Sequence, residues 1–480
     1  MASSVIGMLR RSAIRLGSTN RYTDGSGRKL DTNVLPTDMF VQPISNRAYP
    51  TTTEHWQLVV ANGEPSPYKG RVVVSGGGII GLTAASLFAT RGWHVTVVEK
   101  SSDPEAEDAA SSPHFKKNSV HHVRHALLTK RAADALGFAG VTLDELRPIG
   151  VKVKGALDHP GSFNTFLTKG LTEHHPFAVN MLSIDLFQLR RLLDRQLRAL
   201  PSRNCKVFYD HKIVAALPQQ KKLVVKALRD FDKDGAPPIH IVENRDETSL
   251  TLNLKRMEEA ELEGIDYDLV ICAEGVNSSL RDYVDVEGFA ADREFAVQWF
   301  RFTSKTMSRE HVHRWIHTRK TRVADLSHQN SAVHTPMCMA FPQLEEHSFA
   351  LMAYMPLCEM EALSPEEFRR AYCPDIDGEL LSASDTCESF PTIHCEDLFN
   401  SVGLPSTVMV GDAAHTCNPF LMQSLAMGLE DCSFLLNHID ALSRHFYDSV
   451  KQYSRERGVA GDALRETTER CLYYERRKHA

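Results

Sequence analysis

The sequence lacks any C-x-x-C pair, because its ten cysteines are scattered between Cys205 and Cys471 without a framework of spacings. This pattern favours reduced, mostly buried thiols over a disulfide scaffold. No cluster has metal-ligand spacing, so we predict no metal site. A net positive charge is also absent: the net charge of -6 gives no whole-chain footprint for nucleic acid. Internal repeats and low-complexity tracts are absent as well.

Long apolar runs are missing with one exception. Residues 72–90 are uncharged and long enough to suggest a membrane span. The glycine triplet, the Ser and Thr content and the strand-like start of this run argue against that interpretation. We therefore predict no membrane span, and the 480 residues with 42% hydrophobics predict two domains or one large elaborated domain.

The same run predicts a dinucleotide-binding βαβ unit over residues 71–100. A buried strand leads into the G-x-G-x-x-G formed by Gly76, Gly78 and Gly81, and a helix and a second strand follow. Gly76 permits the tight turn, Gly78 lets backbone approach a pyrophosphate, and Gly81 lets helix and strand pack closely. The helix N-terminus favours the phosphates. Glu99 ends the second strand, where a carboxylate can accept a hydrogen bond from a ribose hydroxyl.

The N-terminal region precedes this unit. Residues 1–17 carry three arginines and three serines but no acid, and their apolar residues can line one helix face. This composition favours a mitochondrial presequence over a disordered basic tail. Residues 18–70 are proline-rich with little periodicity, which predicts either a solvated linker or a segment extended over this protein or a partner.

Two further motifs lie after strands. Residues 273–281 read A-E-G-V-N-S-S-L-R and follow the apolar strand expected at 267–272. Gly411 and Asp412 follow the buried strand expected at 407–410, and Pro419 and the sequence G-L-E-D-C at 428–432 come next. Asp412 is well placed to accept hydrogen bonds from ligand hydroxyls, and the alternative is a helix N-cap. We also expect helices at 120–136, 183–200, 423–437 and most of 442–478, with antiparallel strands at 295–302 and 348–354.

In this order, the three motifs resemble those of the flavoprotein aromatic hydroxylases, and within that family the chain looks most like the kynurenine 3-monooxygenases. The resemblance spans roughly residues 71–477. It implies an α/β fold: a Rossmann-like FAD-binding domain with an inserted antiparallel-sheet substrate domain and C-terminal helices. It further implies FAD as cofactor and NADPH as co-substrate, with one oxygen atom of O₂ passing to an electron-rich aromatic ring.

The resemblance also assigns residues and regions. The FAD-binding domain would comprise 71–285 and 401–440, the substrate-domain sheet 286–400, and the helical region 441–480. A small, aromatic, amino-acid-like substrate would be held by His122, Arg124 and Tyr473, the last by analogy with an Asn-Tyr-x-Glu-x-Arg signature. The implied cofactor residues are Gly76, Gly78, Ile80, Gly81, Glu99, Lys100, Arg124, Glu274, Gly275, Arg281, Gly411, Asp412, Pro419, Gln423 and Ser424. No catalytic side chain is assigned with certainty.

Several positions depart from the family pattern. Glu274 replaces an Asp, Leu472 replaces the signature Asn, and residues 183–189 lack an expected arginine. Most seriously, the expected Gly-Gln-Gly-x-Asn after Pro419 reads M-Q-S-L-A at 422–426. A left-handed conformation costs a non-glycine residue about 1–2 kcal/mol, and a lost hydrogen bond costs about 0.5–1.5 kcal/mol. A total of about 4 kcal/mol would turn a nanomolar cofactor into a micromolar one.

Two functions follow from these observations. The first is an FAD-dependent, NADPH-using aromatic hydroxylase of the mitochondrial matrix. The second is a catalytically impaired protein that keeps the fold and serves as a structural or assembly subunit of a mitochondrial complex, with residues 18–70 as the contact. The intact glycine motif favours the first, and the altered loop at 422–426 favours the second.

Overall fold

The computed structural model describes the chain in stretches: 68–106, 124–159, 181–201, 204–217, 220–228, 240–241, 263–283, 290–292, 295–316, 336–382, 388–390, 392–395, 398–400, 406–441 and 446–477. The predicted presequence, nearly all of residues 18–70 and His122 lie outside these stretches, as does the side chain of Tyr473. The predicted domain boundaries stay predictions.

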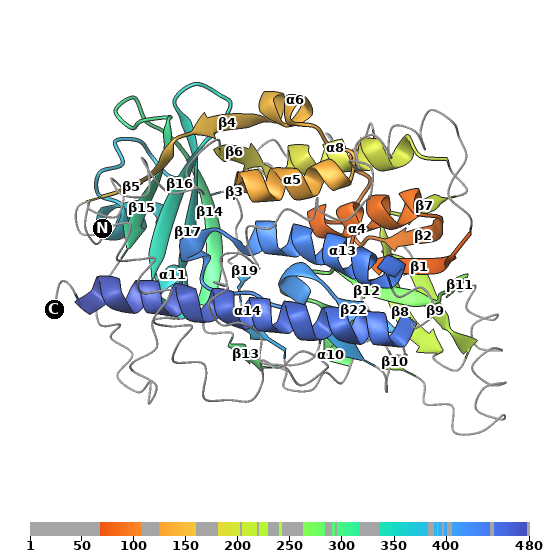
Figure 1. Ribbon diagram of the computed structural model, residues 1–480. Coiled ribbons are helices and arrows are strands. Elements are labelled where there is room, and N and C mark those ends of the chain that lie inside the picture. The colour runs from red at the N-terminus through yellow and green to blue at the C-terminus, as the bar shows by residue number, and fades with distance from the viewer. Residues whose placement is uncertain are drawn as a thin grey trace, which may run out of the picture.

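A six-stranded sheet forms the centre of the nucleotide-binding half (Figure 1). Its strand order is β21-β22-β12-β1-β2-β7, and only β21 runs antiparallel to its neighbour. The strands are β1 (Gly70–Ser75), β2 (Trp93–Val98), β7 (Cys205–Phe208), β12 (Leu269–Cys272), β21 (Phe399–Asn400) and β22 (Thr407–Met409). The inner strands read as continuous apolar runs because both faces of the sheet are buried. The Rossmann-like core is confirmed.

Helices cover this sheet. Every residue of α4 (Ile79–Thr90) from Gly81 onward is buried, which explains why the run resembled a membrane span. It contacts α8 (Leu186–Arg198) and α13 (Ser424–Ala441), and α13 in turn contacts α5 (Lys130–Phe138). The N-terminus of α8 is capped by Asp185, which accepts from the N–H groups of Phe187 and Gln188.

A seven-stranded sheet forms the other half. Its order is β18-β14-β17-β16-β15-β5, with β19 also pairing with β14, and its only parallel pair is β15 with β5. The strands are β5 (Gly155–Asp158), β14 (Phe295–Thr303), β15 (His311–Ile316), β16 (Met337–Pro342), β17 (Ser348–Pro356), β18 (Leu381–Ser382) and β19 (Glu388–Ser389). The expected antiparallel strands are confirmed. Odd-numbered residues of β14 face one apolar cluster and even-numbered residues another, so this sheet is also buried on both faces.

Three small sheets complete the strands. They are β10-β8-β9-β11, β3-β6-β4 and the pair β13-β20. Their strands are β3 (His125–Leu128), β4 (Gly150–Val153), β6 (Met181–Asp185), β8 (His211–Leu217), β9 (Lys222–Ala227), β10 (His240–Ile241), β11 (Glu263–Asp266), β13 (Ala290–Asp292) and β20 (Thr392–His394). The remaining short helices are α6 (Leu143–Leu146), η6 (Arg147–Ile149), α10 (Ser279–Tyr283), α11 (Leu357–Glu361), α12 (Pro365–Tyr372), η10 (Gly411–Ala413) and η11 (Pro419–Leu421).

Two helix predictions were wrong at their starts. Residues 125–128 form β3 rather than helix, because they pair with β6, and α5 begins only after Thr129, which caps it. Likewise residues 183–185 belong to β6, and α8 starts at Leu186. In both places the tertiary pairing of strands overrides a helical sequence pattern.

The long C-terminal helix α14 (Phe446–Arg477) runs along one side of the molecule, from the six-stranded sheet to the seven-stranded sheet (Figure 1). It contacts α13, β21 and η11. Within the described part of the chain, every helix is too short or too polar to cross a membrane.

Candidate dinucleotide site

The candidate site lies at the carboxyl ends of four adjacent parallel strands. Glu99 follows β2, Gly76 to Gly78 follow β1, Glu274 and Gly275 follow β12, and Gly411 and Asp412 follow β22. All three sequence motifs therefore meet at one sheet edge. In open α/β sheets this edge is where ligands bind.

The glycines of the first motif have the roles that their spacing predicts. Gly76 has a φ of +102°, and a Cβ on it would lie 2.5 Å from the carbonyl oxygen of Ala273. A Cβ on Gly81 would lie 1.8 Å from the carbonyl oxygen of Gly76. Gly78 differs, because no protein atom lies within 4 Å of the position its Cβ would take. The tight turn therefore needs Gly76 and the helix packing needs Gly81, whereas Gly78 faces open space.

Glu99 is buried beside this turn. Its carboxylate accepts a hydrogen bond from the Gly77 N–H, and its other oxygen accepts from the Ser101 N–H at 2.7 Å. The adjacent Lys100 is exposed. The protein backbone thus fixes the Glu99 side chain at the end of β2, and each carboxylate oxygen retains a lone pair for a ligand hydroxyl.

Arg190 is a site residue that the sequence analysis missed. Its Nε donates to the Gly77 carbonyl oxygen at 2.9 Å, and its Nη2 lies 3.8 Å from a carboxylate oxygen of Glu99. The sequence did contain a signal for this role, because Arg190 directly follows residues 183–189, where an arginine was expected. A helix predicted from residue 183 places its first turns at 183–189, whereas α8 begins at Leu186 and so brings Arg190 into its first five residues.

The charged side chains of the second motif hydrogen-bond to other groups of the protein. The Glu274 carboxylate accepts from Ser75 Oγ at 2.5 Å, Ser278 Oγ at 2.9 Å and the Leu280 N–H at 2.9 Å, so it caps α10. Arg281 is buried and donates to the carbonyl oxygens of Val276 and Ala413. Gly275, with a φ of +77°, has open space on its Cβ side. Of this motif, Gly275 therefore remains available to a ligand.

Asp412 in the third motif is partly exposed, and no described residue hydrogen-bonds its carboxylate. Burial raises the pKa of Asp412 to about 6, and the neighbouring Asp431 adds to this while His415 opposes it. The N-cap alternative is wrong, because Asp412 lies within η10 (Gly411–Ala413), whose N-cap is Val410. The next helix, η11, is capped by Asn418. Ile80 packs against Gly411 and so joins the first motif to the third.

A buried network of charged side chains holds the third motif in place. Asp431 accepts from the Gly411 N–H at 2.8 Å, from His415 Nε2 at 2.7 Å and from Arg457 Nε at 2.6 Å. Arg457 also lies 3.6 Å from Glu430, which pairs with Arg131. These ion pairs connect α13, α14 and α5 behind the ligand edge. The motif at 428–432 pointed to this region, but not to this role.

The loop after Pro419 differs from the glycine loop that the resemblance implies. Met422 is left-handed, with a φ of +53° and a ψ of +32°, and ends η11 (Pro419–Leu421). The Gln423 amide nitrogen donates to the Leu421 carbonyl oxygen at 3.2 Å, while its buried amide oxygen has no hydrogen bond among the described residues. Ser424 begins α13. A non-glycine residue therefore occupies the strained position.

The side chains of this loop fill the space between the two halves. Phe420 is 5% exposed and packs in the apolar cluster on the inner face of the seven-stranded sheet, and Leu421 and Met422 pack against the same cluster. The Arg314 guanidinium lies 5.0 Å from the Phe420 ring centroid. The sheet residues of this cluster include Phe295, Val297, Trp299, Met352 and Tyr354. Aromatic and aliphatic side chains thus meet directly where the two halves join.

Arg124, implied for both cofactor and substrate, lies just before β3, and its carbonyl oxygen accepts from the Leu186 N–H at 3.0 Å. It is therefore placed at the N-terminus of α8, one turn from Arg190. Among the described residues, no group of three or more His, Cys, Asp or Glu could hold a metal ion.

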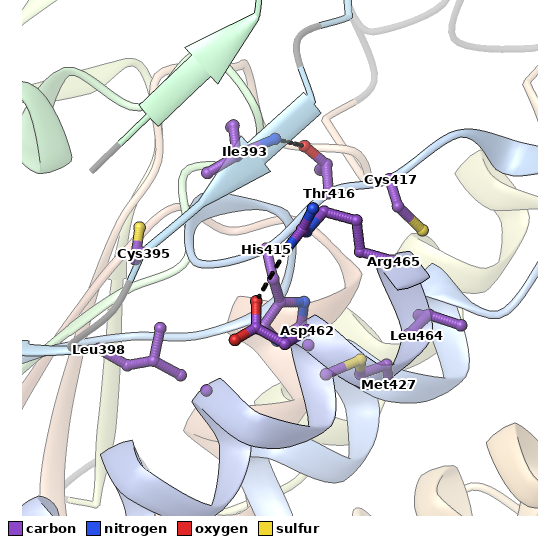
Figure 2. Close-up of a pocket in the computed structure, with 12 residues that line it drawn as sticks. Ile393, Cys395, Leu398, His415, Thr416, Cys417, Met427, Asp462, Leu464 and Arg465 are labelled. Atoms are coloured by element: carbon purple, nitrogen blue, oxygen red, sulfur yellow. Dashed lines mark hydrogen bonds and ion pairs between the residues drawn. The ribbon is translucent and has the colours of Figure 1, made fainter. Parts of the chain in front are cut away.

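Figure 2 shows a small pocket between the third motif and α14, lined among others by His415, Thr416, Met427 and Arg465. In it Arg465 donates to Asp462, and the Ile393 N–H donates to Thr416 Oγ1. The free space suffices for about one water molecule. This pocket cannot hold an organic substrate.

The described residues fit the dinucleotide part of FAD better than its ring. Gly78 and Gly275 leave backbone open to phosphates, and Asp412 offers an unoccupied acceptor. The resemblance would place the flavin ring at the loop 422–426, where Met422 and Ser424 stand in place of glycines.

Comparisons with known proteins found similar sequences and structures. A family model described as FAD dependent oxidoreductase matches residues 71–283. Kynurenine 3-monooxygenase of Neurospora crassa is 25% identical over 416 residues, which cover 82% of this chain and 73% of the relative. The enzyme of the same name from Caenorhabditis briggsae is 23% identical over 418 residues, covering 80% and 77%.

Solved structures share the fold. p-Nitrophenol 4-monooxygenase PnpA from Pseudomonas putida DLL-E4 has a TM-score of 0.56 at 17% identity, covering 85% of this chain and 89% of that chain. PqsL from Pseudomonas aeruginosa, described as a probable FAD-dependent monooxygenase, has a TM-score of 0.55 at 16% identity, covering 84% and 96%.

The chain thus has the fold of these monooxygenases, and over residues 71–283 it is similar to FAD-dependent oxidoreductases. More particularly, it is similar to the kynurenine 3-monooxygenases over about four fifths of its length. The resemblance inferred from the three motifs is confirmed.

Proposed function

We propose that the chain binds FAD at the edge formed by β2, β1, β12 and β22 and acts as an aromatic-ring hydroxylase that uses NADPH. The observation that carries the proposal is the convergence of Gly78, Gly275 and Asp412 at this edge, each open to a ligand. Glu99 would accept from the adenosine ribose and Asp412 from the hydroxyls of the ribityl chain.

Bound FAD would supply the redox chemistry, including the activation of O₂. The protein would position the ring, exclude water and anchor the substrate. For a carboxylate-bearing substrate such as kynurenine, the proposed anchors are Arg124, with His122 and Tyr473. The proposed compartment is the mitochondrial matrix, on the composition of residues 1–17.

The absorbance spectrum of purified protein tests the cofactor directly, because bound oxidised flavin is yellow. The NADPH consumed and the hydroxylated product formed with kynurenine present test the reaction. Stoichiometric flavin with coupled product formation supports the hydroxylase. If the purified protein takes up no FAD even when FAD is supplied in excess, the hydroxylase proposal is refuted.

A second function is favoured by one specific observation, the packing of Phe420, Leu421 and Met422 against the seven-stranded sheet. We infer that a protein with this loop would hold the flavin ring weakly and serve as a structural subunit of a mitochondrial complex through residues 18–70. Little NADPH oxidation, together with co-purification of the chain in a large complex that is lost without residues 18–70, would support this function.

A further inference from the structure

We propose that Arg190 supplies the positive charge that pairs with the phosphates of the adenine dinucleotide, in place of the arginine missing from residues 183–189. This inference rests on the proposed binding of FAD at the sheet edge. It assigns to one residue a role that the altered sequence had left vacant.

The position of Arg190 carries the argument. The side chain is 12% exposed and lies against the Gly76 to Gly78 turn, where its Nε donates to the Gly77 carbonyl oxygen at 2.9 Å. The next residue, Gly78, has open space on its Cβ side. The guanidinium is therefore fixed beside the backbone that would contact a pyrophosphate.

One amino group of the Arg190 guanidinium lacks a hydrogen bond among the described residues. Arg190 Nη2 is buried and makes no hydrogen bond within the described part of the chain, although the Glu99 carboxylate lies 3.8 Å away. A buried donor without an acceptor destabilises the free protein, and more so when it is charged. Phosphate oxygens at the turn would accept from it, and guanidinium groups match phosphate geometry well.

The electrostatics require a cation here. Glu99 is buried, and a diphosphate placed at the same turn would bring two more negative charges close to it. The N-terminus of α4 contributes about half a positive charge, and its first turn contains no basic residue. Arg190 balances Glu99 in the free protein and can serve the phosphates once the ribose hydroxyls occupy Glu99.

Helix geometry explains how Arg190 can take the place of an arginine one helical turn earlier. Leu186, one of the residues 183–189 that lack the expected arginine, lies four residues before Arg190 on α8, so the two lie on the same face of the helix. A long side chain on a helix points back toward the N-terminus. An arginine at 190 can therefore reach the turn that an arginine one turn earlier would reach.

Arg190→Gln tests the inference, with Arg191→Gln as the matched control. Arg191 is the next residue on the same helix and pairs with Glu105 at 2.9 Å, away from the glycine turn. We expect Arg190→Gln to weaken the binding of FAD and ADP at least tenfold while leaving adenosine, which lacks phosphates, within twofold. Arg191→Gln should bind all three as the wild type does. Adding Leu186→Arg to Arg190→Gln should restore most of the affinity for ADP.

The outcomes separate the inference from the function beneath it. Wild-type protein that binds neither FAD nor ADP refutes the proposed function. Wild-type protein that binds both, with Arg190→Gln unchanged, refutes only the role of Arg190. An equal loss for ADP and adenosine would mean that Arg190 merely pins α8 to the turn. If Arg190→Gln fails to fold, Arg190→Lys keeps the charge and should retain a preference for ADP over adenosine; loss of that preference would overturn the inference.

Discussion

At the residue scale, the glycines of the site differ in what a methyl group would do to them. A methyl on Gly78 meets no protein atom within 4 Å, so the fold should tolerate it. The same methyl would occupy the space that a pyrophosphate needs. We therefore expect Gly78→Ala to abolish binding of FAD and ADP with an unchanged melting temperature. Binding is measured by calorimetry and stability by thermal unfolding.

Gly137 provides the matched control, because a methyl there also meets no protein atom. It lies within α5, where Gly→Ala gains about 0.5–1 kcal/mol of helix stability. Gly137→Ala should thus bind FAD normally and melt slightly higher. Full cofactor content in Gly78→Ala with an intact fold would contradict the assignment of the site to residues 76–99.

The loop at 422–424 determines how well a ring can be held. In the proposed binding mode, Met422 and Ser424 both add side chains where the backbone would approach the flavin. Met422 is left-handed without any ligand, so the cost of about 1–2 kcal/mol for that conformation falls on the fold and not on FAD binding. Met422→Gly with Ser424→Gly should strengthen FAD binding by roughly a hundredfold, at 2.7 kcal/mol. Equilibrium titration of apoprotein with FAD measures this change. The affinity for ADP, which has no flavin, should stay constant.

Ala426 should be left unchanged in that experiment. The family pattern has an asparagine at this position, but Ala426 is 2% exposed within the main apolar cluster. A buried amide without partners costs about 1–3 kcal/mol. Equal FAD affinity in the double-glycine variant and the wild type would show that the loop does not limit binding.

Asp412 predicts a dependence of stability on pH. Its folded-state pKa of about 6 lies above the ordinary value of 3.8, so folding favours the protonated carboxyl. Its stabilising contribution is therefore complete below about pH 4 and is lost as the pH rises through 6. Asp412→Asn, which mimics the neutral form, should melt like the wild type at pH 4 and higher than it at pH 8. Identical differences in melting temperature at both pH values would contradict this account.

At the element scale, α14 fixes the third motif through Arg457, whose guanidinium pairs with Asp431 in a fully buried setting. Removing one partner of such a pair costs about 3–5 kcal/mol, because the other charge stays buried. We expect Arg457→Met to lose this amount in urea unfolding. Arg455→Met, at an exposed position two residues earlier, should change little.

The same network gives a pH signature at the acid end. Attraction from His415 and Arg457 holds the pKa of Asp431 below its ordinary value despite its burial. A group with a lowered pKa stabilises the fold above its unfolded pKa and loses that effect as the pH falls through its folded pKa. The difference in stability between wild type and Arg457→Met should therefore shrink below about pH 4. A difference independent of pH would point to lost packing alone.

The elements show which features a sequence can reveal. The β1-α4-β2 unit was predictable because glycine spacing and a buried apolar run are local properties. The start of β3 was not, because residues 125–128 become a strand only by pairing with β6 more than fifty residues away. Arg190 and the Asp431 network escaped for the same reason: their partners come from distant parts of the chain.

At the scale of the whole molecule, the dinucleotide end of the site matches the family's sequence pattern, whereas the ring end departs from it. The dinucleotide edge is built by the six-stranded sheet and its glycines, all of which are in place. The ring end depends on the contact between η11 and the seven-stranded sheet, where Phe420 and its neighbours fill the junction. A flavin enzyme needs both ends, whereas a structural subunit needs only the fold that the first end stabilises.

Residues 1–17 should direct the whole chain to mitochondria. Residues 1–17 carry Arg10, Arg11 and Arg15 without an acidic residue, as import presequences do. Because a targeting segment is not part of the mature fold, deletion of residues 1–17 should leave the melting temperature unchanged. The truncated protein should no longer reach mitochondria, as measured by fractionation and fluorescence microscopy. Replacing the three arginines with glutamine should have the same effect, since import depends on the positive charge, whereas replacing Ser3 and Ser4 with alanine should not. Mitochondrial accumulation of the arginine-free protein would refute the presequence, and with it the proposed matrix location of both candidate functions.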